Sequence, residues 1–197
     1  MSSGSRSCLL GSALLTSLFV AAAQNAPKQV TGNAPAHRMN ELRLAGLRPG
    51  RDTASKALEL YGKPNGKGGP ASGTLIWGAT CQTQTLSIDV DDGNKIQVIR
   101  TTEESRGLGD CAKLDPKTWR TGNGLRVGDP IKKIAALYGE PDSRSPSTRG
   151  GQRLELWYYA FDWAGADVPQ VMEVLCTREA DGTAGRVVEI TLAAPSL

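Results

Sequence analysis

Apolar residues recur at helical intervals in two short segments of the chain, 54–61 and 131–138. In each segment they occupy positions i, i+3, i+4 and i+7, namely Ala54, Ala57, Leu58 and Tyr61, and then Ile131, Ile134, Ala135 and Tyr138. This spacing predicts an amphipathic helix with one buried stripe in each segment. We expect Leu58 and Ile134 to be equivalent core positions of the two helices.

Both predicted helices have clear end signals. Asp52 and Asp129 stand where an N-cap residue accepts backbone hydrogen bonds. Pro130 suits the first helical position, because no N–H is needed there. Gly62 and Gly139 follow the apolar stripes and are expected to end the helices with a positive φ.

Each predicted helix is followed by three segments of strand composition. These segments are 74–80, 85–90 and 95–101 in the first half of the chain, and 153–163, 170–177 and 186–192 in the second. Asp92-Gly93 and Asp181-Gly182 separate the last two strands of each set and indicate hairpins. Flexible loops are expected at 63–73 and 142–152, and a weaker helical turn before each helix, at 38–44 and 116–120.

The two halves repeat one pattern. Leu-Arg-Pro-Gly at 47–50 and Leu-Tyr-Gly-Lys-Pro at 60–64 are matched by Leu-Arg-Val-Gly at 125–128 and Leu-Tyr-Gly-Glu-Pro at 137–141. The offset is 78 at the first match and 77 at the second, and farther along Trp77 matches Trp157. Consecutive strands with short connections favour antiparallel pairing. The predicted fold is therefore α+β, with two tandem helix-helix-three-strand units whose antiparallel sheets carry helices on one face.

The chain begins like an exported protein. Arg6 precedes an apolar run at 9–19, and Ala21-Ala22-Ala23 offers a small-residue cleavage site, which together predict a signal peptide over residues 1–23. The apolar run is too short to span a bilayer, which takes about 20 residues. Cys8 lies before this run, so no lipid anchor is expected. We expect a periplasmic or secreted protein with no transmembrane anchor and at most a peripheral association with the envelope.

The remaining boundaries follow from the repeats and from local composition. Residues 24–37 are rich in Gln, Asn, Pro and Ala and are predicted to form a flexible lead. Repeat unit 1 is expected at 38–101 and repeat unit 2 at 119–194. Residues 102–118 are predicted to form a linker that includes the start of the second unit.

Charge and composition narrow the function classes. The chain has 23 Lys and Arg residues against 20 Asp and Glu residues, so it lacks the basic footprint of a nucleic-acid binder. Its one histidine, His37, falls in the predicted lead, where it cannot be held as a general base. No His and Cys residues cluster as zinc ligands do. We therefore expect no catalytic residue, metal or cofactor.

Carboxylate chemistry supplies the alternative enzyme class. Asp89, Asp91 and Asp92 lie close together near Gly93. A carboxylate-based hydrolase acting on envelope material is therefore an alternative function. The position of these residues between two predicted strands favours a solvated hairpin tip.

The cysteines allow one predicted disulfide. Cys81 and Cys111 lie in the first repeat and its exit segment, and we predict that they are joined, closing a loop of 31 residues from 81 to 111. Cys176 shares strand parity with Met172 and Val174, which favours a buried small hydrophobe. Pairing of Cys176 with one of the other two cysteines remains an open alternative.

The second half resembles a known family. The residues concerned are Gly-Leu-Arg-Val-Gly at 124–128, Leu-Tyr-Gly-Glu-Pro at 137–141, Trp-Tyr-Tyr-Ala-Phe at 157–161, and the valines and isoleucine of the last strand. They resemble BamE of the SmpA/OmlA family, small outer-membrane lipoproteins that assist β-barrel assembly. The chain departs from that family by its doubled unit and by the missing lipoprotein cysteine.

Two such units in tandem are similar to the β-lactamase inhibitory protein fold, in which they form a concave sheet surface. The resemblance covers residues 38–192. It implies a small extracytoplasmic scaffold that binds protein surfaces.

The strand at 153–163 is apolar on both faces. Side chains alternate along a strand, so the aromatic residues Trp157, Tyr159, Phe161 and Trp163 share one face. The opposite face carries Leu154, Leu156, Tyr158 and Ala160. Two short helices should cover only one face of a sheet, and Leu154, Leu156 and Tyr158 already provide an apolar one.

These arguments lead to a predicted function. We expect Trp77, Trp157, Tyr159, Phe161 and Trp163 to form a surface that binds another extracytoplasmic protein. Packing of the segment around Trp119, or of the other repeat, on these aromatic residues is the alternative. The predicted function is a non-catalytic protein-binding module that supports envelope assembly or inhibits a secreted enzyme. A purely structural envelope protein is a further alternative.

Overall fold

The computed structural model describes residues 40–66, 73–79, 83–103, 115–161, 170–178 and 185–194. The elements of the first half are α1 (Ala54–Tyr61), β1 (Thr74–Ala79), β2 (Gln84–Val90) and β3 (Ile96–Glu103). A 3₁₀ turn at Pro116–Thr118 precedes the elements of the second half. These are α2 (Ile131–Tyr138), β4 (Ser143–Arg149), β5 (Gln152–Phe161), β6 (Gln170–Thr177) and β7 (Val187–Ala193).

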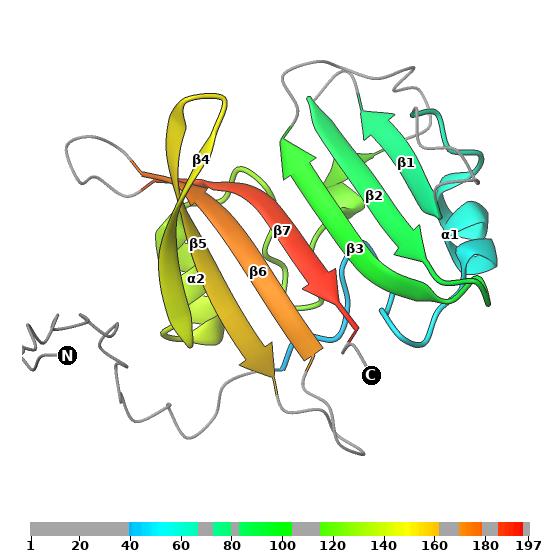
Figure 1. Cartoon of the computed structure of the whole chain (residues 1–197), viewed down its shortest axis with the longest axis horizontal. Coiled ribbons are helices and arrows are strands. Elements are labelled where there is room, and N and C mark those ends of the chain that lie inside the picture. Colours follow the sequence, from blue (N-terminus) through cyan, green and yellow to red (C-terminus); the bar gives the residue numbers. More distant parts are fainter. Residues whose placement is uncertain are drawn as a thin grey trace, which may run out of the picture. The chain divides into compact units, whose positions relative to one another are not determined.

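The seven strands of the described residues form a single antiparallel sheet, in the order β1-β2-β3-β7-β6-β5-β4 (Figure 1). The two halves meet where β3 pairs with β7, for example at Thr101 and Ile190. Residues 1–39 and 104–114 lie outside the described residues. The predicted signal peptide, lead and linker therefore stay predictions.

The predicted pair of helix-helix-three-strand units is wrong. The described part of 38–44 is not helical, and 116–120 contains only the 3₁₀ turn. Within the described residues, each half therefore contributes one α-helix, and the second half contributes four strands to the common sheet. Short polar segments such as 38–44 have too few apolar positions to stabilise a separate helix by packing.

The strand β4 lies in a segment that the sequence predicted to be a flexible loop. It is Ser-Arg-Ser-Pro-Ser-Thr-Arg and is exposed along nearly its whole length, and among the described strands it pairs with β5 alone. Such a segment has no apolar alternation to reveal a strand. The turn that pairs β4 with β5 is Gly150-Gly151, in which both residues have positive φ, 56° and 81°. Two glycines of this kind form the tight hairpin turn that matches strand twist.

One face of the sheet carries the main core. Buried residues of all strands except β4 form one cluster with Ala57 of α1, Ile134 and Tyr138 of α2, and Trp119. In Figure 1, α2 lies behind β5. Ile134 is fully buried, as predicted, but Leu58 is 43% exposed, so its predicted core position is wrong. The buried counterpart of Ile134 in α1 is Ala57, which lies 77 residues before it. In α1, the equivalent core position is therefore Ala57 and not the predicted Leu58.

The helix termini match the predictions only in part. Gly62 and Gly139 end the two helices with φ values of 71° and 72°, as expected. The N-cap residues, however, are Thr53 and Pro130, and neither makes a side-chain cap hydrogen bond. The predicted caps close the preceding turns instead. Asp52 accepts a hydrogen bond from the Arg48 N–H at 2.8 Å, and Asp129 accepts one from the Arg126 N–H at 2.9 Å.

Two aromatic pairs show how the halves correspond. Tyr61 of α1 lies 5.8 Å from Trp77, and Tyr138 of α2 lies 5.8 Å from Tyr159, with similar interplanar angles of 59° and 55°. The Trp77 indole N–H donates to the Gly62 carbonyl, and the Tyr159 hydroxyl donates to the Gly139 carbonyl. Trp77 is therefore the counterpart of Tyr159, and its predicted match with Trp157 is two residues out of register.

A buried carboxylate ties the start of the described chain to the second half. Glu41 is 1% exposed and accepts hydrogen bonds from the backbone N–H groups of Gly122 and Asn123, at 2.9 and 3.0 Å. The Tyr138 hydroxyl donates to the same carboxylate at 2.7 Å. Burial, together with the neighbouring Glu41 carboxylate, raises the pKa of Tyr138 far above its ordinary value. Since Tyr138 stays neutral, it remains a donor to Glu41.

Candidate functional site

The predicted aromatic contact surface lies inside the protein. Trp77 and Tyr159 are fully buried, Phe161 is 1% exposed and Trp157 is 5% exposed. Trp163 lies outside the described residues. Side chains this deeply buried cannot form a partner surface, so we correct the predicted site: these four residues belong to the core under the helices.

The packing around these aromatic side chains explains their burial. Tyr138 of α2 lies 5.8 Å from both Tyr159 and Phe161 of β5, in tilted ring contacts. Trp157 donates its indole N–H to Glu155 and is covered by the guanidinium of Arg144, 4.1 Å from the ring centroid. Tyr159 and Phe161 therefore fill the space between the sheet and α2, as large aromatic residues do in cores.

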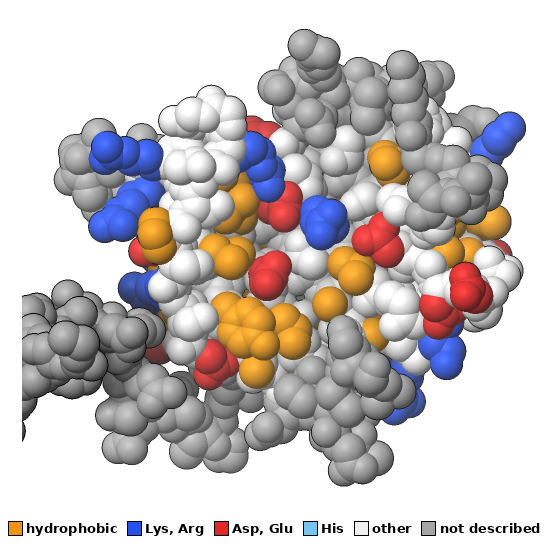
Figure 2. Space-filling model, in the orientation of Figure 1, with side chains coloured by type: hydrophobic (Ala, Val, Ile, Leu, Met, Phe, Trp, Pro, Cys, Tyr) orange, Lys and Arg blue, Asp and Glu red, His pale blue; other side chains and the backbone are white. Residues whose placement is uncertain are grey.

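The opposite face of the sheet is not covered by either helix, and we call it the open face. Register fixes which side chains share it. One row across four strands is Tyr158, Glu173, Thr191 and Arg100, and the next is Ala160, Val171, Ala193 and Val98. Seven of these eight residues are half-buried, and Thr191 is buried. Figure 2 shows hydrophobic side chains gathered on this face over the second half, with charged residues toward the middle of the sheet.

The β4–β5 hairpin bends over one end of the open face. Arg149, at the end of β4, forms an ion pair with Glu189 of β7, although β5 and β6 lie between these strands in the sheet. Beneath this bridge, Leu154, Leu175 and Val188 form a second, smaller apolar cluster with Leu156 at its edge. The hairpin therefore shields three of the apolar residues of this face and leaves Leu156, Tyr158, Ala160 and Val171 half-buried.

Glu189 joins the two halves on the open face. It forms ion pairs with Arg149 from the second half and with Arg100 from the first half, at 3.5 Å for the latter. It also accepts a hydrogen bond from the Thr102 hydroxyl at 3.1 Å. Because its side chain is only 18% exposed, these contacts are less screened than those of a surface pair.

Both edges of the sheet are protected against further strand pairing. Along β1, the backbone N–H groups of Asn65 and Gly66 donate to the Ile76 carbonyl, and the Asn65 side chain pairs with the backbone of Gly78. In β4, the register from the Gly150-Gly151 turn places Pro146 at a non-hydrogen-bonded pair with Glu155. The missing N–H of Pro146 therefore falls on the outer edge, where proline discourages strand addition.

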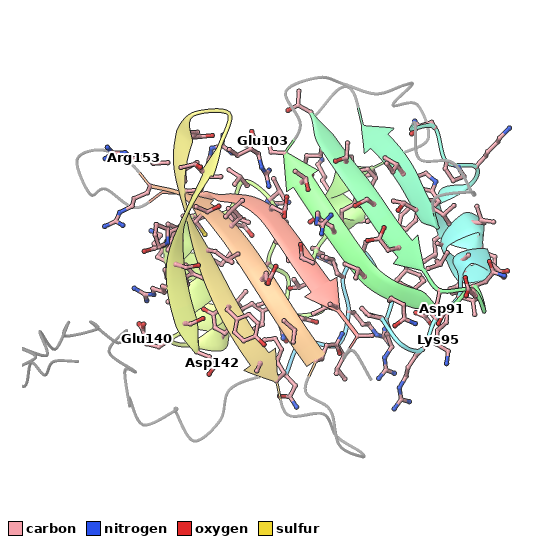
Figure 3. All side chains as sticks on the ribbon, viewed as in Figure 1. Asp91, Lys95, Glu103, Glu140, Asp142 and Arg153 are labelled. Carbon is pink, nitrogen blue, oxygen red and sulfur yellow. The ribbon has the colours of Figure 1, made fainter. Side chains whose placement is uncertain are left out.

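The acidic residues near Gly93 form a hairpin tip. One Asp91 oxygen accepts hydrogen bonds from the Gly93 and Lys95 N–H groups at 2.9 and 2.8 Å, and the other accepts one from Gln97 at 2.7 Å. Asp91 and Lys95 lie together at this tip (Figure 3). Both carboxylate oxygens of Asp91 therefore stabilise the turn, as the hairpin interpretation predicts.

Cys176 is the one cysteine among the described residues, and it is free and fully buried. Burial, with a smaller contribution from Glu155, raises the pKa of its thiol to about 12. Cys81 and Cys111 lie outside the described residues, so their predicted disulfide stays a prediction. Within the described ranges, no three His, Cys, Asp or Glu side chains gather as a metal site would require. No helix there is long and apolar enough to cross a membrane.

Comparisons with known proteins identify no family. No protein-family model matches the chain, and no curated protein matches it. Among solved structures, the chain is similar to YjgB, a DUF4309 family protein of Bacillus subtilis subsp. subtilis str. 168. The TM-score is 0.43 and the identity 13%, with 79% of this chain and 88% of that chain covered.

The chain is also similar to a candidate beta-lactamase inhibitor protein from Streptococcus mutans. Here the TM-score is 0.29 and the identity 15%, with 80% of this chain and 92% of that chain covered. At these TM-scores neither similarity carries an argument about function. The resemblance to BamE stays a prediction.

The sequence identifies the residues of the open face but predicts the wrong role for them. Leu156, Tyr158 and Ala160 lie on the parity that we expected to face the helices. Alternation alone separates the two faces of β5 without saying which one a helix covers. The size of the side chains was the available signal, because the face with the larger rings is the one that fills the deeper core.

Proposed function

We propose that this chain is a non-catalytic extracytoplasmic module that binds another protein through the open face of its sheet. The observation that carries this proposal is an apolar area on β5, β6, β7 and β3 that neither described helix covers. Leu156, Tyr158, Ala160 and Val171 are half-buried there, although the core under the helices is complete without them. Contiguous apolar surface of this kind marks interaction sites in soluble proteins.

The arrangement of the sheet supports binding by the face. Addition of a partner strand at an edge would require free backbone groups. Asn65 and Gly66 occupy such groups along β1, and Pro146 removes one from β4. A partner surface or loop laid across the strands would instead meet side chains from both halves, such as Tyr158 and Val98. Inhibition of a secreted enzyme and support of envelope assembly are two versions of this role.

A pair of substitutions on opposite sides of the molecule tests the proposal. Val171→Asp places a charge on the open face, and Leu58→Asp places the same charge at an exposed apolar position of α1. The partner is first trapped in the native cells by a photoreactive amino acid at position 156 and then purified. We expect Val171→Asp to weaken its binding by about 2 kcal/mol or more, on the scale of interface hot spots.

The control variant Leu58→Asp should bind like the natural chain. Melting temperatures of both variants show that they are folded. Equal affinity of Val171→Asp and the natural chain, or loss of binding only in Leu58→Asp, would contradict the proposal.

A further inference from the structure

Most charged side chains of the open face are paired within the chain. The pairs are Arg149 with Glu189, Arg100 with Glu189 and Thr191, and Asp89 with Thr74. Glu173 differs from them: among the described residues, its carboxylate has no hydrogen bond or ion pair. The nearest guanidinium on the same row, that of Arg100, is directed to Glu189 at 3.5 Å and to the Thr191 hydroxyl at 3.1 Å.

The position of Glu173 makes this unpaired charge unusual. It lies on β6, an inner strand, with Tyr158 beside it on β5 and Thr191 beside it on β7. Along its own strand, Val171 and Leu175 share the same face. Glu173 is half-buried, and its neighbours on this face, Tyr158, Val171, Leu175 and Thr191, carry no charge. A partner that covered this face without an opposite charge would leave a desolvated, unpaired carboxylate, which is strongly unfavourable.

We infer that Glu173 selects the partner by binding a lysine or arginine side chain. This inference rests on the proposed function of the open face. The cationic side chain would stand on a segment whose flanking residues are apolar, since Tyr158 and Val171 are the neighbours of Glu173 on this face. An opposite charge at this point compensates the desolvation of Glu173, and complementary charges of this kind determine which partner is accepted.

The test uses three phage-displayed libraries of disulfide-closed peptides, with Arg, Gln or Glu fixed at the centre and random residues around it. Each library is selected on the full chain, and the affinities of enriched peptides are measured by fluorescence polarisation. We expect Arg-centred peptides with apolar flanks to be enriched. Glu173→Gln should weaken them at least tenfold, and Glu173→Lys should reverse the preference toward Glu-centred peptides.

Two controls accompany the selection. Glu59→Gln removes an exposed carboxylate on α1 and should leave the affinities unchanged. Val171→Asp shows whether a peptide binds the open face at all. Thermal melts of every variant exclude loss of folding as the cause.

The outcomes separate the inference from the function on which it rests. If enriched peptides are lost in Val171→Asp but are indifferent to the central charge and to Glu173→Gln, the role of Glu173 is overturned and the open face remains the binding surface. If no enriched peptide responds to Val171→Asp, both the inference and the proposed function fail. Reversal of the preferred charge in Glu173→Lys is the result that supports both.

Discussion

Tyr158 and Tyr159 are neighbours in β5 and have opposite environments. Tyr159 is fully buried against Tyr138 of α2 and donates to the Gly139 carbonyl. Tyr158 lies half-buried on the open face, opposite Ser143 and Glu173 on the adjacent strands. Two residues of one type, one position apart, thus belong to a folding core and to a proposed binding surface. The difference shows that an apolar strand face belongs to the core only where another element packs on it.

The largest expected effect comes from truncating this pair. Tyr159→Ala removes a ring from the centre of the core and should lower the free energy of unfolding by about 3–5 kcal/mol. Tyr158→Ala removes only cross-strand contacts on the open face and should cost less than about 1 kcal/mol. Urea unfolding of both variants measures the difference. Equal losses would show that the open face is a second folding core.

Truncating one apolar residue in each helix should produce a smaller difference in the free energy of unfolding. Ile134→Ala should cost about 2–5 kcal/mol, because it leaves a cavity in the core under α2. Leu58→Ala should stay within about 0.5 kcal/mol, the usual range for surface positions, because Leu58 is 43% exposed. Chemical denaturation of the two variants compares them. A cost above about 2 kcal/mol for Leu58→Ala would contradict the assignment of Ala57 as the buried counterpart of Ile134.

The bridge over the open face should contribute about 1 kcal/mol. Glu189→Gln removes the charge that holds Arg149 and Arg100, whose side chains are 44% and 42% exposed, so solvent screening limits the loss. The loss should diminish as salt concentration rises. Glu59→Gln, which breaks an exposed pair with Lys56 on α1, is the matched control and should change stability very little. Identical behaviour of the two variants would refute the bridging role of Glu189.

The reaction rates of two cysteines, one on each face of β6, compare the exposure of the core face with that of the open face. Because burial raises its pKa to about 12, Cys176 stays protonated up to pH 9 and should react with iodoacetamide only when the protein opens. A cysteine introduced by Val171→Cys on the open face should react quickly, and faster as the pH rises from 7 to 9. Peptide mass spectrometry reads each site separately. Rapid labelling of Cys176 in the native state would contradict its buried position.

The sequence predicts the individual elements better than their assembly. The predicted bounds of every strand with apolar alternation lie within two residues of the observed ends. The ends of both helices at Gly62 and Gly139 follow from local backbone preferences. The strand β4 could not be found in this way, because Ser-Arg-Ser-Pro-Ser-Thr-Arg has no apolar face. Its only local signal is the Gly150-Gly151 turn.

The joined sheet and the site depend on contacts between distant residues. Nothing local to Thr101 or Ile190 indicates that β3 pairs with β7. The role of the two faces of β5 depends in turn on where α2 packs. The sequence therefore predicts Tyr158 in the core and Tyr159 at the surface, whereas the structure has them the other way round. The composition of β5 indicates more apolar residues than one core face requires. Only the packing of α2 shows which of its two faces is the core.

Hydroxyl-radical footprinting tests the two faces of β5 in one measurement. Oxidation of Tyr158 and Tyr159 is read by tandem mass spectrometry, first for the free chain and then with the partner that is trapped at position 156 and purified. We predict that Tyr158 is oxidised in the free chain and protected in the complex, and that Tyr159 is oxidised in neither. Oxidation of Tyr159 in the free chain, or a complex in which Tyr158 stays as reactive as before, would contradict the proposal that the open face binds the partner.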